Sequence, residues 1–223
     1  MSMIRESGYR TACVGKQHFA HSEINHGYDF ELIVDGHSPL GDPEKIAPYL
    51  AFLQKEGINI RECNDDSLIL GGIWKEKDDL HIDSFVGQEG KKWLEQYPTI
   101  KLVLDVHRDA LVGEDGTVYK AVTRIDGVDT AQVMLVLGSS EGGEHPNWMQ
   151  NLSLACRIQE SMNTLYPTLA RPMTMRSSRY NQQLSNGSLL VEVGTHGNTL
   201  QEALAGARLF ARAAGQVLLG LKE

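Results

Sequence analysis

The sequence predicts an α/β fold with a mostly parallel sheet and helices on both of its faces. Short apolar runs at 101–106 and 188–193 are rich in Leu and β-branched residues, which is typical of buried strands. Longer segments at 84–96, 146–165 and 199–221 repeat apolar residues at helical spacing. Because strands and helices alternate along the chain, we expect helical crossovers, which join parallel strands.

The ends of two helices carry recognisable capping residues. A helix is expected at 43–56, since Pro43 suits its first position and Gly57 suits the position just after its end. The last helix should begin at a capping box, in which the Thr199 hydroxyl and the Glu202 carboxylate each satisfy a backbone N–H of the first turn.

A hairpin is expected between these helices. The segments 118–125 and 130–137 flank Asp126-Gly127. Asp-Gly is a preferred pair for the tight turn of a hairpin, so the two segments are expected to pair around it.

Composition excludes several classes of protein. Of 223 residues, 41% are hydrophobic and 22% are charged, which is near the average of globular proteins and argues against disorder. The net charge of −8 argues against a general nucleic-acid-binding protein, which would be basic. The charge is uneven: residues 1–98 hold 10 Lys/Arg against 17 Asp/Glu, and residues 99–223 hold 11 against 12. The asymmetry is consistent with two segments of different character.

The cysteines and the apolar runs bear on the compartment. Cys13, Cys63 and Cys156 form no Cys-x-x-Cys pair and are odd in number, so neither a disulfide framework nor a thiolate metal site is expected. No apolar run is long enough to span a membrane, and residues 1–10 lack the apolar core of a signal peptide. As written, the chain is expected to be cytoplasmic.

Polar residues follow the two apolar strands at the ends where α/β folds place their sites. Asp105, His107 and Asp109 alternate at the end of the first strand, and Glu192 interrupts the second. A His and a Glu at neighbouring strand ends suit a metal-activated water with a carboxylate base. Two other interpretations stay open: His107 as a core histidine bonded to Asp105, and Glu192 as the ion-pair partner of Arg108.

Several motifs resemble the amidase domain of stage II sporulation protein P. They occur in that family's order over roughly 125 residues, and together they are specific. The motifs are Tyr-Pro-Thr-Ile-Lys-Leu-Val-Leu-Asp-Val-His-Arg-Asp-Ala at 97–110, Val-Leu-Gly at 136–138, Pro-Asn-Trp-Met-Gln-Asn at 146–151, Tyr-Asn-Gln at 180–182, Leu-Leu-Val-Glu-Val-Gly at 189–194 and Asn-Thr at 198–199.

The resemblance implies a zinc-dependent hydrolase of the cell wall. The family hydrolyses the amide between N-acetylmuramic acid and L-alanine in peptidoglycan, and it acts outside the cytoplasm. Carried over, His107 is a zinc ligand and Glu192 is the catalytic carboxylate. Arg108 and Asn198 lie in matching motifs and are assigned to support or substrate contacts.

One departure from the family pattern affects the metal. The family's other zinc ligands, a His and a Glu, lie upstream near a His-Thr-His-like motif, and no such motif precedes Lys101. A catalytic zinc site normally has three protein ligands. We therefore expect weak zinc affinity and little or no amidase activity.

Residues 3–96 resemble a different family, the sulfatases. The run Gly-Lys-Gln-His at 15–18 and Gly-Tyr-Asp at 27–29 resemble sulfatase motifs, as do His-Ile-Asp-Ser-Phe-Val at 81–86 and Lys-Trp-Leu at 92–94. The resemblance implies that Lys16 and His18 contact a substrate sulfate, whereas spacing alone favours an ordinary polar strand end. The Cys-x-Pro-x-Arg motif that supplies the sulfatase nucleophile is absent.

The two resemblances predict a composite chain, with a sulfatase-like fragment at 1–96 and an amidase-like segment at 97–223. Peptidoglycan hydrolysis by the second segment is the first hypothesis. Sulfate-ester hydrolysis by the first segment and a non-catalytic fusion of two incomplete domains are the alternatives.

Overall fold

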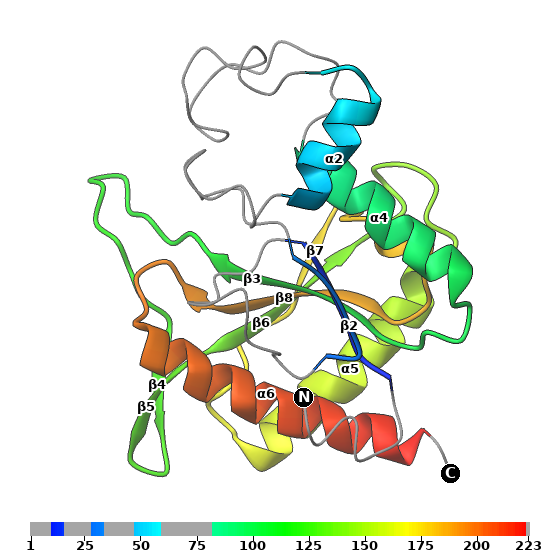
Figure 1. Ribbon diagram of the computed structural model, residues 1–223. Coiled ribbons are helices and arrows are strands. Elements are labelled where there is room, and N and C mark those ends of the chain that lie inside the picture. The colour runs from blue at the N-terminus through cyan, green and yellow to red at the C-terminus, as the bar shows by residue number, and fades with distance from the viewer. Residues whose placement is uncertain (1–9, 16–27, 34–46, 59–81, 222–223) are drawn as a thin grey trace. The chain divides into compact units, whose positions relative to one another are not determined.

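The computed structural model describes residues 10–15, 28–33, 47–58 and 82–221 (Figure 1). The chain divides into two compact units, 1–98 and 99–223.

The described part of the first unit combines a small parallel sheet with two helices. Strand β1, Ala12–Gly15, pairs in parallel with β2, Phe30–Ile33. Helix α2, Ala47–Lys55, and helix α4, Ile82–Gln96, share an apolar cluster, since aromatic and aliphatic residues at helical spacing face one another. Its buried members are Tyr49, Leu53, Ile82 and Phe85.

The second unit is built on a four-stranded sheet in the order β3-β8-β6-β7. The strands are β3, Val103–Asp109, β6, Val133–Gly138, β7, Thr174–Arg176, and β8, Ser188–Thr195. Strand β8 runs parallel to β3 and antiparallel to β6, and β6 runs parallel to β7. The α/β class and the mostly parallel pairing are thereby confirmed.

Two long helices pack on one face of this sheet and lie side by side (Figure 1). They are α5, Trp148–Leu165, and α6, Leu200–Gly220. Every second residue of β6 and of β8 points towards these two helices, because side chains alternate between the two faces of a strand. Burial of each large apolar side chain contributes roughly 1.5–3 kcal/mol to stability. The strand residues of this core are Val133, Leu135, Leu137, Leu189, Val191 and Val193, and those from the helices include Leu154, Ile158, Met162 and Phe210.

The expected hairpin forms, but it is shorter than the sequence pattern indicates. Strand β4, Val122–Ile125, pairs with β5, Val128–Ala131, around Asp126 and Gly127, which both have positive φ. The apolar run 130–137 was expected to pair as one strand. Instead the chain changes sheets at Gln132, whose backbone N–H donates to the carbonyl of Ala121, and the rest of the run becomes β6.

Local signals fix the start of α6. The Thr199 hydroxyl accepts a hydrogen bond from the Glu202 N–H, and the Glu202 carboxylate accepts one from the Thr199 N–H, which confirms the capping box. Further along, a side chain at Gly206 would meet the Ala131 carbonyl oxygen at 2.3 Å, so glycine lets the helix approach β5. None of the helices in the described ranges is long and apolar enough to cross a membrane.

Candidate active site

His107 and Glu192 lie opposite one another in the parallel pairing of β3 and β8. Both lie on the sheet face opposite α5 and α6, because Leu104 and Val191 face the helices and side chains alternate along each strand. Glu192 has a second register partner, Met134, on β6, the strand on the other edge of β8. The two predicted site residues are therefore neighbours on one face near the carboxyl ends of their strands.

The His107 ring is held by Asp105. Its Nε2 lies 2.6 Å from Asp105 Oδ1, and about half of each side chain is exposed. This hydrogen bond raises the pKa of His107, and the negative charges of Asp105 and Glu192 add to the effect while partial burial opposes it. The interpretation of His107 as a core histidine bonded to Asp105 is therefore right about the bond. It is wrong about the core, because about half of the His107 side chain is exposed.

The Glu192 carboxyl group is half-buried, and its Oε2 is buried without a hydrogen-bond partner in the described structure. Burial raises the pKa of Glu192, as do the negative charges of Asp109 and Asp105, whereas His107 and Arg171 lower it. Among the described residues, Arg108 makes no ion pair with it. A carboxyl group with a raised pKa and a free oxygen suits proton transfer.

Arg171 is a site residue that the sequence did not indicate. It precedes β7, and its Nη1 lies 2.8 Å from Asp109 Oδ2 at the end of β3. The backbone N–H of His196, just after β8, donates to the Asp109 carbonyl at 2.9 Å. Arg171 stands in no motif, and only the pairing of β6 with β7 brings it to this end of the sheet.

The comparisons with known proteins bear on these same residues. The sequence model of the family described as Stage II sporulation protein P matches residues 87–215. The chain belongs to this family. The match begins within α4 and includes His107, Asp109, Arg171 and Glu192.

A curated relative is Stage II sporulation protein P of Bacillus subtilis (strain 168), which is 29% identical over 108 residues. The match covers 46% of this chain and 25% of the relative, so the chain spans about a quarter of the length of that protein.

Solved structures with some similarity include three amidases. N-acetylmuramoyl-L-alanine amidase AmiC2 of Nostoc punctiforme has a TM-score of 0.40 at 13% identity, covering 93% of this chain and 97% of that one. The N-acetylmuramyl-L-alanine amidase Ami1 of Mycobacterium abscessus has a TM-score of 0.45 at 13% identity, covering 96% and 99%. The CwlD amidase of Clostridioides difficile, in complex with the GerS lipoprotein, has a TM-score of 0.42 at 13% identity, covering 96% and 100%.

The side chains of this stage II sporulation protein P family member fit only part of a zinc site. No group of three His, Cys, Asp or Glu side chains suited to a metal occurs among the residues that the structure describes. His107 Nε2 contacts Asp105, and Asp109 is paired with Arg171, whereas Glu192 Oε2 is free. Among the described residues, His107 is thus the assigned ligand of any metal centre, and the free oxygen of Glu192 lies beside it.

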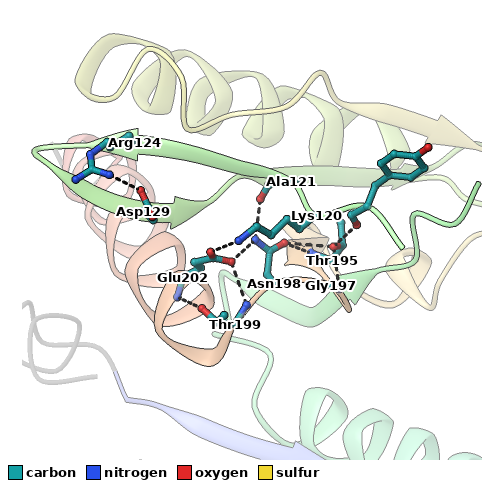
Figure 2. A network of polar contacts seen from close by, with 10 residues as sticks. Lys120, Ala121, Arg124, Asp129, Thr195, Gly197, Asn198, Thr199 and Glu202 are labelled. Atoms are coloured by element: carbon teal, nitrogen blue, oxygen red, sulfur yellow. Dashed lines mark hydrogen bonds and ion pairs between the residues drawn. The ribbon is translucent and has the colours of Figure 1, made fainter. Parts of the chain in front are cut away.

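Asn198 is used within the protein (Figure 2). Its Oδ1 accepts from the Thr195 N–H at 2.8 Å, and its Nδ2 donates to the Ala121 carbonyl at 3.1 Å and to Glu202 Oε2 at 2.8 Å. These bonds favour the support role that was expected for Asn198 over a substrate contact. Arg108 is exposed, and strand alternation places it on the face opposite His107.

Two other motif residues also stabilise the fold. Asn151 Oδ1 accepts from the N–H groups of Gly187 and Ser188, and Gln182 bonds the Gly138 N–H and the Val136 carbonyl. Both side chains are buried at the end of β8 away from Glu192. The sulfatase-like residues Lys16 and His18 lie outside the described residues and before the part that matches the family.

Proposed function

We propose that the second unit is an amidase that acts on peptidoglycan and hydrolyses the amide between N-acetylmuramic acid and L-alanine. In this proposal His107 is a zinc ligand and Glu192 is the catalytic carboxylate. Membership of the stage II sporulation protein P family supports the substrate class. The observation that carries the proposal is the placement of His107 directly opposite Glu192, whose buried Oε2 has no partner within the described structure.

In the proposed reaction, the Glu192 carboxyl group accepts one proton and then donates it. The oxygen of a water molecule attacks the carbonyl carbon, and Glu192 accepts the proton that this water loses. As the carbon–nitrogen bond breaks, Glu192 donates the proton to the departing alanine nitrogen, so a carboxylic acid and an amine result. A raised pKa suits this exchange because the carboxyl group must gain and lose a proton near neutral pH. When bound, zinc would polarise the carbonyl and acidify the water.

We expect the proposed activity to be slow in this chain. Catalytic zinc sites normally have three protein ligands, and His107 is the one ligand assigned among the described residues, with Glu192 as the catalytic carboxylate. With fewer ligands the metal is held weakly, so only a small fraction of the protein carries it at ordinary zinc concentrations. Turnover should therefore rise with added zinc and stay low without it.

Release of peptides from purified peptidoglycan tests the proposal. We expect slow release that increases with added zinc and is lost in Glu192→Gln. A suitable control is Glu141→Gln, since Glu141 is an exposed carboxylate in the loop after β6. Release that survives Glu192→Gln, or no release at millimolar zinc, would contradict an amidase site. The second outcome would favour the non-catalytic alternative.

Sulfate-ester hydrolysis by the first unit stays an alternative that rests on the sequence. Its two substrate residues, Lys16 and His18, are not among the described residues. A chromogenic aryl sulfate distinguishes it from the amidase proposal, because the two reactions release different products.

A further inference from the structure

The ion pair between Arg171 and Asp109 joins opposite edges of the four-stranded sheet. The Arg171 N–H donates to the Val133 carbonyl at 2.7 Å, on the edge of β6 where β7 pairs. Asp109 ends β3, on the far side of β8. Neighbouring strands lie about 4.8 Å apart, so the two side chains must meet over β6 and β8, the strands between them. The positive charge of Arg171 lowers the pKa of Glu192 on β8, which agrees with this placement.

The guanidinium group of Arg171 has donors to spare. The Arg171 side chain is 18% exposed, and it carries five N–H donors. Within the described structure, its hydrogen bond at 2.8 Å is the one from Nη1 to Asp109 Oδ2. None of its nitrogen atoms is a buried atom without a partner, so the remaining donors are open to solvent. A guanidinium group that is fixed at one nitrogen and accessible at the others is well placed to hold a ligand.

The charges around Arg171 favour a neutral ligand. Asp105, Asp109 and Glu192 are close enough for their charges to act on one another. Three carboxyl groups therefore surround the permanent positive charge of Arg171, with the titratable ring of His107 beside them. A further anion would be repelled by these carboxylates. A carbonyl oxygen is not repelled, and it accepts hydrogen bonds from N–H groups.

We propose that Arg171 binds the carbonyl oxygen of the amide bond that is cleaved. The proposal rests on the proposed function, which supplies the amide and brings its carbonyl carbon to the water beside Glu192. Asp109 holds the guanidinium group through Nη1, and one of the remaining N–H groups donates to the carbonyl oxygen. Arg171 thereby fixes the orientation of the amide relative to Glu192.

The same contact acts on the reaction. When the water oxygen bonds to the carbonyl carbon, one electron pair of the carbonyl double bond moves to the carbonyl oxygen, which becomes negative. The hydrogen bond from Arg171 then strengthens without proton transfer, because the guanidinium group stays protonated. As the carbon–nitrogen bond breaks, the electron pair returns to form the new carboxyl group, and the nitrogen takes its proton from Glu192. Arg171 thus stabilises the transition state more than the substrate.

An NMR titration without zinc tests this contact separately from catalysis. The probe is N-acetylmuramoyl-L-alanine methylamide, a neutral molecule that contains the amide bond. We expect the Nε–H signal of Arg171 to shift as the probe binds. Arg171→Lys keeps a positive charge for Asp109 but lacks the planar fork that bonds two partners, so affinity should fall by about tenfold. The matched control is Arg124→Lys, at the exposed Arg124–Asp129 ion pair of the hairpin, which should bind the probe as the wild type does.

Each outcome decides the proposal. It is overturned if the wild type does not bind the probe, if Arg171→Lys binds it equally well, or if Arg124→Lys loses as much affinity. Tighter binding of N-acetylmuramoyl-L-alanine, which has a free carboxylate, would also overturn it. Should Arg171→Lys fold poorly, the shift of the Arg171 signal in the wild type, assigned through its bonds, still decides. If the probe binds at Arg171 but peptidoglycan is not cleaved, or cleavage survives Glu192→Gln, the proposed function fails and the contact stands.

Discussion

His107 of β3 and Glu192 of β8 are register partners in a parallel pair of strands, so their side chains leave the same face of the sheet side by side. Asp105 holds the His107 ring through a 2.6 Å contact, and the Asp109–Arg171 ion pair lies at the end of β3, two residues after His107.

Asp105→Asn should lower the pKa of His107 in the metal-free protein. The carboxylate of Asp105 stabilises the charged ring through a hydrogen bond and through its charge. NMR titration of the ring protons measures the effect, with His107→Gln to assign the signal. Asp129→Asn, which breaks an exposed ion pair with Arg124, should leave the titration unchanged.

The raised pKa of His107 also makes the stability of the fold depend on pH. Because the pKa of His107 is raised in the folded protein, protonation of this ring stabilises the fold below its unfolded pKa. That contribution is lost as the pH rises through the folded pKa. Urea unfolding of the wild type and of Asp105→Asn should therefore differ more at acidic than at alkaline pH. A constant difference across that range would contradict the coupling.

Arg171→Met should destabilise the second unit and raise the pKa of Glu192. The substitution leaves Asp109, which is largely buried, without its 2.8 Å partner, and such a loss costs roughly 1–3 kcal/mol. It also removes a positive charge that lowers the pKa of Glu192. Adding Asp109→Asn should recover part of the stability, and a double-mutant cycle from urea unfolding measures the coupling. Additive effects of the two substitutions would show that the pair is not coupled.

Asn151→Leu should be among the more damaging single substitutions. It leaves the buried N–H groups of Gly187 and Ser188 without their acceptor, which costs roughly 1–3 kcal/mol for each group. Thermal unfolding should show a drop in the midpoint. Gln150→Leu, at the exposed neighbouring position of α5, is the control and should have little effect.

The sequence predicts much of this arrangement because the decisive signals are local. Apolar runs ending in polar residues located β3 and β8, and the Thr199–Glu202 pair located the start of α6. Once those strands are neighbours, the placement of His107 beside Glu192 follows. The class of fold follows in the same way from the alternation of strands and helices.

Other features depend on contacts between distant residues, which no local pattern reveals. Arg171 meets Asp109 only because β7 joins the sheet beside β6. The run 130–137 contains no Gly or Pro, so its division at Gln132 is set by the sheet that each part joins and not by a turn residue. Asn198 occurs in a family motif, but its bond to the Ala121 carbonyl depends on where the chain between β3 and β4 returns.

The affinity of the purified protein for zinc, measured by competition with a chelator, shows whether His107 holds a metal. We predict one weak site, with a dissociation constant in the micromolar range or weaker, which corresponds to roughly 8 kcal/mol or less. Binding there should be lost in His107→Gln and kept in His196→Gln, because His196 Nδ1 faces the Asp109 carbonyl. One equivalent of tightly held zinc that survives His107→Gln would contradict the proposed site.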